Sequence, residues 1–331
     1  MSTTDLQKQF YSEIETALAN LNLPDHPVTL YKPFEYALTA GGKRIRPVLT
    51  MFACGMCKGN SQDSISAALA VEILHNFTLV HDDIMDSADT RRGKPSVFKK
   101  WDENVAILSG DVMFAGAMQQ LAFYGHNEEY TKQEFSALYD VFLKATVTVC
   151  EGQALDMEFV DREDVELNEY IEMISGKTAA LLSASLEMGA IVAHSTSTQR
   201  EELALIGNEM GIAFQIQDDL LDAIADPEKF GKRAGGDIFE GKKTYLTILA
   251  LERANKDEKA LIKETLLNKN PTKESVEHVL TLMKDLKIIE DVASEIERRY
   301  KKAFELLEHF PASNYKEELK KLLTFLRYRD H

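Results

Sequence analysis

The chain has 331 residues, of which 44% are hydrophobic and 28% are charged, and its formal net charge is -16. A sizeable hydrophobic core is therefore possible, and global disorder is not expected. The acidic balance argues against a nucleic-acid-binding protein, because such proteins usually carry a basic face. A polyanionic substrate would need local cations or metal ions to offset this negative field.

The first residues and the apolar tracts predict a cytoplasmic protein. The N-terminal residues lack the basic and apolar pattern of a secretory signal. No run of eighteen or more apolar residues occurs, since the most apolar tract, Thr178 to Ala193, contains Glu187. We therefore expect no transmembrane segment.

Helical patterns extend along most of the chain. All eight prolines lie outside the stretch from Ser96 to Asp226, which favours long helices. Apolar residues in Ile65 to Val80 recur at spacings of three and four on both faces, which predicts a deeply buried helix. The same pattern occurs in Lys177 to Ala193 and in Leu203 to Leu221, and no convincing alternating strand pattern is present.

Four segments are predicted to be coil, and none of them divides the chain into separate domains. They are Leu21 to Pro27, Ser87 to Pro95, Ala225 to Gly241 and Asn268 to Thr272. From about Ala254 onward the pattern predicts amphipathic outer helices. We expect one all-α domain that covers residues 1–331.

The three cysteines do not form a disulfide framework. Cys54 and Cys57 have C-x-x-C spacing, but a zinc site needs about four ligands and Cys150 is remote in sequence. A thioredoxin-like site would need a βαβ context, which the sequence lacks. We interpret these cysteines as small apolar helix residues.

Two aspartate clusters with the pattern D-D-x-x-D each follow an apolar helix. Asp82 and Asp86 are one helical turn apart, as are Asp218 and Asp222, so each pair shares a helix face. Like charges at this spacing, near a helix C-terminus, destabilise the helix. Magnesium compensates such a pair, because it prefers carboxylate oxygens and bridges them to substrate phosphates. The alternative is that the aspartates are simply solvated at a helix end. Two such clusters in one chain make this alternative less favoured.

Glycine-flanked cations lie near both clusters in sequence. They occur in Gly41-Gly-Lys-Arg-Ile-Arg-Pro47, Arg91-Arg-Gly-Lys94, Gly176-Lys-Thr178, Gly231-Lys-Arg233 and Gly241-Lys-Lys-Thr244. Each alone is more often a solvated loop, but the set suits two diphosphate groups. Glu72 and His75 form a Glu-x-x-His, but a di-iron bundle needs a second one, and no other histidine has a glutamate three residues before it.

Together with G-Q-x-x-D at Gly152 to Asp156 and F-Q before the second cluster, this ordered set of motifs resembles the trans-isoprenyl diphosphate synthases. The resemblance is strong from Phe34 to Thr244. It implies a bundle of mostly antiparallel helices around a deep central cavity, a homodimer, and three Mg²⁺ ions bound with the substrate.

The resemblance also implies roles for individual residues. The metal ligands would be Asp82, Asp86, Asp218 and Asp222, and isopentenyl diphosphate would be bound by Lys43, Arg46, His75 and Arg92. The allylic diphosphate would be bound by Arg91, Lys177, Lys232 and Lys242, with Lys242 the weaker candidate. Lys177 and Lys232 would also act in catalysis, with Thr178 and Gln215 as oxygens near an allylic cation.

The implied reaction joins isopentenyl diphosphate to an allylic diphosphate. Family knowledge assigns the floor of the product pocket to Phe77 and Thr78, although Phe77 lies roughly 140° from the Asp82 face of an ideal helix. An aromatic residue followed by a small one favours a geranylgeranyl product, with farnesyl next. Alternatively, Phe77 is core packing, and Met113, Met118 or another helix sets the floor.

Two other functions share part of this pattern. A class I terpene cyclase carries the first D-D-x-x-D, but its second metal motif contains Asn or Asp, then Ser or Thr, then Glu. A catalytically silent subunit of a heteromeric prenyl synthase usually lacks one acidic motif or the isopentenyl-binding cations. The chain keeps both sets, which favours an active synthase.

Overall fold

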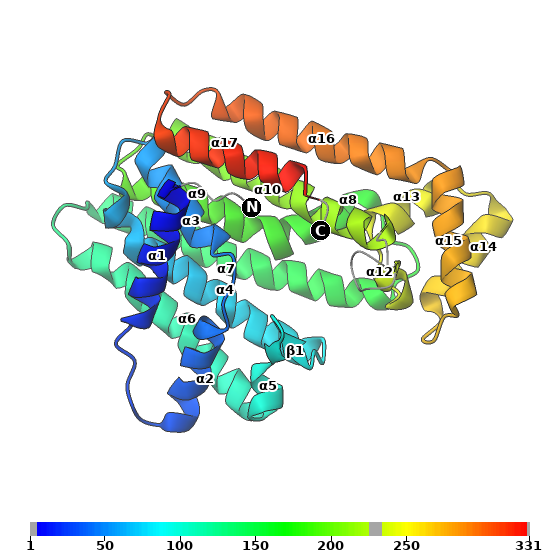
Figure 1. Ribbon diagram of the computed structural model, residues 1–331, viewed down its shortest axis with the longest axis horizontal. Helices are drawn as coiled ribbons and strands as arrows, with labels where there is room; N and C mark the ends of the chain where they lie inside the picture. The colour runs from blue at the N-terminus through cyan, green and yellow to red at the C-terminus, as the bar shows by residue number, and fades with distance from the viewer. Residues whose placement is uncertain (1–4, 225–233, 330–331) are drawn as a thin grey trace. The chain divides into compact units, whose positions relative to one another are not determined.

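The computed structural model describes residues 5–224 and 234–329, and its secondary structure is almost entirely helical (Figure 1). The predicted all-α fold class is confirmed. In the part of the chain that is described, the one sheet is the antiparallel pair β1 (Thr90–Arg91) and β2 (Lys94–Pro95). This short ladder lies in a segment that was expected to be coil.

The helices follow one another with short connections. In chain order they are α1 (Asp5–Ala19), α2 (Val28–Thr39), α3 (Ile45–Met56), η1 (Ser61–Ser64), α4 (Ile65–Met85), α5 (Val97–Lys100), α6 (Glu103–His126), α7 (Lys132–Asp161), α8 (Leu167–Ile174), η2 (Ser175–Ala179), α9 (Ala180–Val192), α10 (Ser197–Ile224), α12 (Gly236–Phe239), α13 (Tyr245–Arg253), α14 (Lys256–Leu267), α15 (Lys273–Asp285), α16 (Ile288–Leu307) and α17 (Asn314–Arg327). The three helices predicted from periodicity are present.

Tertiary contacts group the chain into two compact units. The first unit comprises Met1–Thr146, Ala184–Ala204 and Phe310–Leu319, and the second comprises Val147–Ser183, Leu205–His309 and Lys320–His331. The single domain and the deep central cavity stay predictions.

Helix α4 forms the centre of the first unit, where it packs against α3 and α6. Its residues Val71 and Leu74 are fully buried, as its apolar faces predict. Gly110 of α6 allows the close approach of the two helices, because a Cβ atom there would lie 2.3 Å from Nε2 of His81. Figure 1 shows α4 and α6 side by side. This packing holds the C-terminal end of α4, which carries the first aspartate cluster.

Helix α6 is long and apolar enough to cross a membrane, by length and composition only, and 33% of its most apolar stretch is buried. A core helix of a water-soluble protein meets the same criteria. In the structure α6 packs against α2 and α4.

In the second unit, α13 packs against α8, α14, α15 and α16. Helix α16 is amphipathic, as predicted, and it buries Val292, Tyr300 and Leu307 on one face. Buried apolar side chains at helical spacing stabilise such a helix by removing apolar surface from water.

The cysteines differ in environment. Cys54 is buried in α3, where burial raises the pKa of its thiol to about 12. Cys57 follows α3 and is half-buried, whereas Cys150 is exposed on α7. Cys54 and Cys150 are helix residues, as interpreted, but only Cys54 is buried.

Candidate functional site

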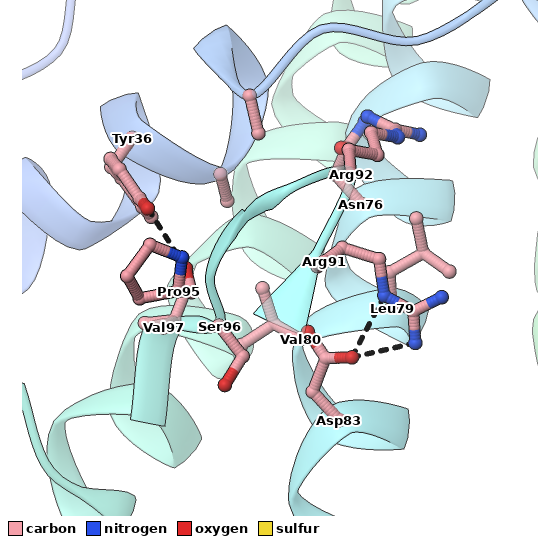
Figure 2. Close-up of a pocket in the computed structure, with 12 residues that line it drawn as sticks. Tyr36, Asn76, Leu79, Val80, Asp83, Arg91, Arg92, Pro95, Ser96 and Val97 are labelled. Atoms are coloured by element: carbon pink, nitrogen blue, oxygen red, sulfur yellow. Dashed lines mark hydrogen bonds and ion pairs between the residues drawn. The ribbon is translucent and has the colours of Figure 1, made fainter. Parts of the chain in front are cut away.

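The first aspartate cluster lies at the C-terminal end of α4, where Asp82 and Asp86 are one turn apart. Asp83 differs from both, because its side chain is only 4% exposed. Arg91 of β1 donates from Nε to Oδ1 of Asp83 at 2.8 Å (Figure 2). Its Nη2 lies 3.4 Å from Oδ2 of Asp82. Burial raises the pKa of Asp83, while the hydrogen bond and charge of Arg91 oppose that rise. Arg91 therefore anchors Asp83 and partly neutralises Asp82.

A pocket of about 560 Å³ in the first unit brings together the four residues predicted to bind isopentenyl diphosphate. Lys43, Arg46, His75 and Arg92 all line it, together with Ala40, Gly42, Arg44, Ile45 and Glu72. Its positive side chains come from two separate segments of the chain, residues 43–46 and Arg92, which the fold places around one space. Such a cluster suits an anion with several oxygens.

His75 lies deep in this pocket as a neutral imidazole. Nη1 of Arg46 lies 3.1 Å from Nε2 of His75, and a neutral ring accepts this hydrogen bond. Burial, followed by the charges of Arg46 and Arg92, lowers the pKa of His75 well below 6.5. Burial also lowers the pKa of Arg46 to about 10, which keeps its guanidinium charged near neutral pH.

The lowered pKa of His75 predicts a pH dependence of stability. As the pH falls through about 6.5, the unfolded chain takes up a proton on His75 and the folded chain does not, so stability is lost. We expect His75→Gln to remove up to about 1.4 kcal/mol per pH unit from the slope of unfolding free energy below that pH. Urea denaturation from about pH 8 to about pH 5 measures it, with exposed His278→Gln as control. An unchanged slope in His75→Gln would contradict the neutral buried state.

A glycine pair shapes the mouth of the pocket. Nη1 of Arg92 donates to the carbonyl oxygen of Gly41. Gly42 has φ +142°, and a Cβ atom there would lie 2.9 Å from Cζ of Arg92. A side chain at Gly42 would therefore both strain the backbone and displace the guanidinium.

Arg44 also lines the pocket, and its side chain is fully enclosed. It adopts a left-handed conformation, with φ 47°, immediately before α3. Its guanidinium donates to Oε1 of Glu15, to Oε1 of Glu72 and to the carbonyl oxygen of Leu38, each at 2.6 Å. Because Lys43 and Arg46 flank this residue, the network fixes the segment that presents both cations.

The three aspartates of the second cluster, at the end of α10, have three different environments. The Asp218 side chain is 56% exposed, and Nη2 of Arg329 donates to its Oδ1 at 2.8 Å. Asp219 is buried and accepts hydrogen bonds from Tyr170 and Gln215. Asp222 accepts one from the backbone N–H of Asp237 at 3.0 Å. The shared sequence pattern therefore does not mean a shared role.

Asp237 belongs to this acidic group, although the sequence reading missed it. Burial, followed by the charge of Asp222, raises its pKa to about 6. The neighbouring Gly236 allows this approach, because a Cβ atom there would lie 2.8 Å from Oδ1 of Asp222. The Gly-Gly-Asp sequence was the available signal, and it was read only as coil.

Lys177 and Thr178 lie in η2, a single turn of π-helix between α8 and α9. Gly152 of α7 makes room for this turn, because a Cβ atom there would lie 2.2 Å from the backbone nitrogen of Lys177. Nζ of Lys177 lies 2.5 Å from Oδ2 of Asp156, and Oγ1 of Thr178 donates to Oε1 of Gln215 at 2.9 Å. The G-Q-x-x-D and K-T motifs are thus one structural feature. Interruptions of this kind often mark functional positions.

Two further cations, Lys232 and Lys242, were predicted to bind the allylic diphosphate. Lys232 lies outside the described residues. Lys242 makes ion pairs with Glu240 at 2.6 Å and with Asp237 at 3.5 Å. Burial lowers its pKa, but the hydrogen bond and charge of Glu240 and the charge of Asp237 outweigh burial and raise it. Lys242 therefore stays charged while bound to carboxylates of its own chain.

An aromatic cluster surrounds Phe77 in the first unit. The Phe77 ring packs against His81 at 4.7 Å and against Phe114 at 5.9 Å, measured between ring centroids. Phe114 stacks in turn on Phe142 at 6.3 Å. Met113, the alternative floor residue, is fully buried. Phe77 is thus backed by further aromatic rings that sequence periodicity did not single out.

Comparison with known proteins identifies the family. The polyprenyl synthetase family profile matches residues 27–283. A short chain isoprenyl diphosphate synthase of Methanocaldococcus jannaschii is 43% identical over 77% of this chain and 76% of its own. A geranylgeranyl diphosphate synthase of Saccharolobus solfataricus is 38% identical, covering 95% and 94% of the two chains.

A solved structure is similar over almost the whole length. The geranylgeranyl pyrophosphate synthetase of Pyrococcus horikoshii has a TM-score of 0.91 and 36% identity, covering 98% of each chain. Sequence and fold therefore agree with the motifs and with the cation-lined pocket. The chain belongs to the polyprenyl synthetase family.

Proposed function

We propose that this protein is a magnesium-dependent prenyltransferase that condenses isopentenyl diphosphate with allylic diphosphates to a short all-trans product, with geranylgeranyl diphosphate favoured. The observation that carries this proposal is the 560 Å³ pocket where Lys43, Arg46 and Arg92 surround neutral His75. These groups suit the diphosphate of isopentenyl diphosphate. The names and similarity of the relatives support the same reaction class.

The carboxylates fit magnesium by their chemistry. Mg²⁺ uses oxygen ligands and is usually held by one or two carboxylates, with water and substrate phosphates completing its shell. Asp82 and Asp86 would hold two ions, and Asp218 with Asp222 would hold a third. When bound, the ions neutralise charge that develops on the departing diphosphate.

The protein side chains would divide the remaining work. Arg91, Lys177 and Lys232, with Lys242 as the weaker candidate, would bind the allylic diphosphate, where Lys177 and Lys232 also stabilise its developing charge. Thr178 and Gln215 would present oxygen atoms to the allylic carbon as it becomes positive.

The proposed reaction balances without a protein nucleophile. The allylic carbon–oxygen bond breaks, and the diphosphate leaves with the electron pair. The double bond of isopentenyl diphosphate then forms the new carbon–carbon bond, and a proton passes to the released diphosphate. A new allylic double bond results, so the product can serve as the next allylic substrate.

The aromatic cluster supports Phe77, next to Thr78, as the floor of the product pocket. We expect Phe77→Ala to lengthen the main product by about one five-carbon unit, since removing the ring vacates space that Phe114 then limits. Chromatography of the dephosphorylated products measures the length. Met113→Ala tests the alternative floor, and an unchanged product in Phe77→Ala would place the floor elsewhere.

The function is tested directly by incubating the purified protein with Mg²⁺, labelled isopentenyl diphosphate and each of three allylic primers. A ladder of products that ends at a defined length supports the proposal. Cyclic hydrocarbons would indicate a class I terpene cyclase. No condensation with any primer would indicate a silent subunit that requires a partner chain.

We further propose a cytoplasmic homodimer. Leu108 and Phe123 are large apolar side chains exposed on α6. A second copy that covers them would remove apolar surface from water.

A further inference from the structure

Four side chains of the second unit form a continuous chain of hydrogen bonds. The Tyr170 hydroxyl of α8 donates to Oδ2 of Asp219. Nε2 of Gln215 donates to Oδ1 of Asp219 at 3.1 Å. The Thr178 hydroxyl of η2 donates to Oε1 of Gln215 at 2.9 Å. The chain therefore links a buried tyrosine to one of the residues proposed to face the allylic carbon.

The Gln215 amide sets the direction of this chain of hydrogen bonds. Its Nε2 donates to Oδ1 of Asp219, which leaves its carbonyl oxygen to accept a hydrogen bond. The carbonyl oxygen of the amide then faces Thr178, which must donate to it. Burial and the charge of Asp219 raise the pKa of Tyr170 well above its usual range, so its hydroxyl keeps the proton that it donates.

The direction of the chain decides what Thr178 offers to a ligand. A hydroxyl has one proton, and that of Thr178 is used on Gln215. Oγ1 therefore has only lone pairs for any further partner. An oxygen held in this way presents the negative end of its dipole, which stabilises a positive charge and disfavours another hydrogen-bond acceptor.

These hydrogen bonds give Asp219 a different environment from that of Asp218 in the same motif. Both of its oxygens have hydrogen-bond partners, and the residue is 6% exposed. Asp218 is largely exposed by comparison. Asp219 thus serves as an internal anchor while Asp218 faces outward.

We propose that Tyr170 and Asp219 are positioning residues that fix the orientation of the Gln215 amide and keep Thr178 an acceptor toward the allylic cation. This inference rests on the proposed prenyltransferase function. Neither residue touches the substrate, and both act through Gln215. The effect is therefore felt mainly in the transition state, where the positive charge develops.

The protein contains a second buried tyrosine that serves as a matched control for the Tyr170 hydroxyl. Tyr300 of α16 is also fully buried, and its hydroxyl donates at 3.3 Å to Oε1 of Gln217, which lies on α10 like Gln215. Tyr300→Phe removes the same group from a buried contact with the same helix. Gln217 also donates to the backbone carbonyl of Arg327, and among the described residues it makes no hydrogen bond to Thr178.

The test compares Tyr170→Phe, Thr178→Val, the double variant and Tyr300→Phe in steady-state kinetics with both substrates, alongside thermal unfolding. We expect Tyr170→Phe to lower kcat about tenfold or more, with both KM values within about twofold of wild type. In the Thr178→Val background it should have no further effect, because Thr178 is the group through which it acts. Tyr300→Phe should keep wild-type kcat.

Three results would overturn the inference. They are a wild-type kcat in Tyr170→Phe, effects of Tyr170→Phe and Thr178→Val that multiply in the double variant, and an equal loss in Tyr300→Phe. The wild-type enzyme distinguishes failure of the inference from failure of the function. If the wild type makes no prenyl product, the proposed function itself is wrong.

Discussion

Replacing Asp82 with alanine is expected to lower kcat by roughly a thousandfold or more, because charge on the departing diphosphate loses its main compensation. Asp82 and Asp86 lie one turn apart at the end of α4, which suits two ions that share one substrate. The fold should persist, since Arg91 keeps its closer contact with Asp83. Single-turnover rates at saturating Mg²⁺, with circular dichroism and thermal unfolding, measure both effects. Asp218→Ala should behave similarly.

A neighbouring aspartate provides the control for this experiment. Asp89 pairs with Lys99 at 2.8 Å, and its side chain is exposed. Asp89→Ala changes the same net charge close to the first cluster in sequence, and it should keep near-normal turnover. Near-normal turnover in Asp82→Ala would instead refute the metal assignment and with it the proposed reaction.

Replacing Arg44 with methionine is expected to lower the free energy of unfolding by about 3–5 kcal/mol. The change leaves Glu72, whose side chain is 2% exposed, without its buried counter-charge. Methionine keeps much of the aliphatic stem, so lost packing contributes less than the stranded carboxylate. Urea denaturation at neutral pH measures the loss.

Two further variants separate charge from packing. Adding Glu72→Gln to Arg44→Met should recover a large part of the lost stability, because no buried charge then remains. Glu15→Gln should cost little, since the Glu15 side chain is 39% exposed and solvent screens its charge. If Arg44→Met lowered the free energy of unfolding by less than about 1 kcal/mol, water would have to reach Glu72, and the network would not stabilise the pocket.

Sequence patterns predicted well what depends on neighbours along the chain. The helix from Ile65, the aspartates one turn apart and the glycine-flanked cations all follow from local spacing. The structure brings the four residues that were predicted to bind isopentenyl diphosphate to one pocket. The coil at Asn268 to Thr272 is also present. Local pattern sufficed because helix periodicity repeats over a few residues.

The features that sequence reading missed depend on contacts between distant segments. Glu15 meets Arg44 across 29 positions, and Tyr170 meets Asp219 across 49. Nothing in the local pattern distinguishes such residues from other buried or solvated ones. Asp237 had a weak signal in its glycine pair, but its proximity to Asp222 became visible only after folding. The C-terminal Arg329 donates to Asp218 across 111 positions, and sequence alone could not place it because this contact also depends on folding.

The π-helical turn at η2 changes the direction in which the side chains after it point. One additional residue in a turn rotates everything that follows by about 100°, given 3.6 residues per α-helical turn. Residues of α9 at the helical spacing of the packed face of α8 therefore point in a different direction from that face. A deletion of one residue between 175 and 179 could leave a regular helix that aims Lys177 and Thr178 in new directions. In alignments of related chains, a single-residue gap in this turn would accordingly mark a change in chemistry more than a change in stability.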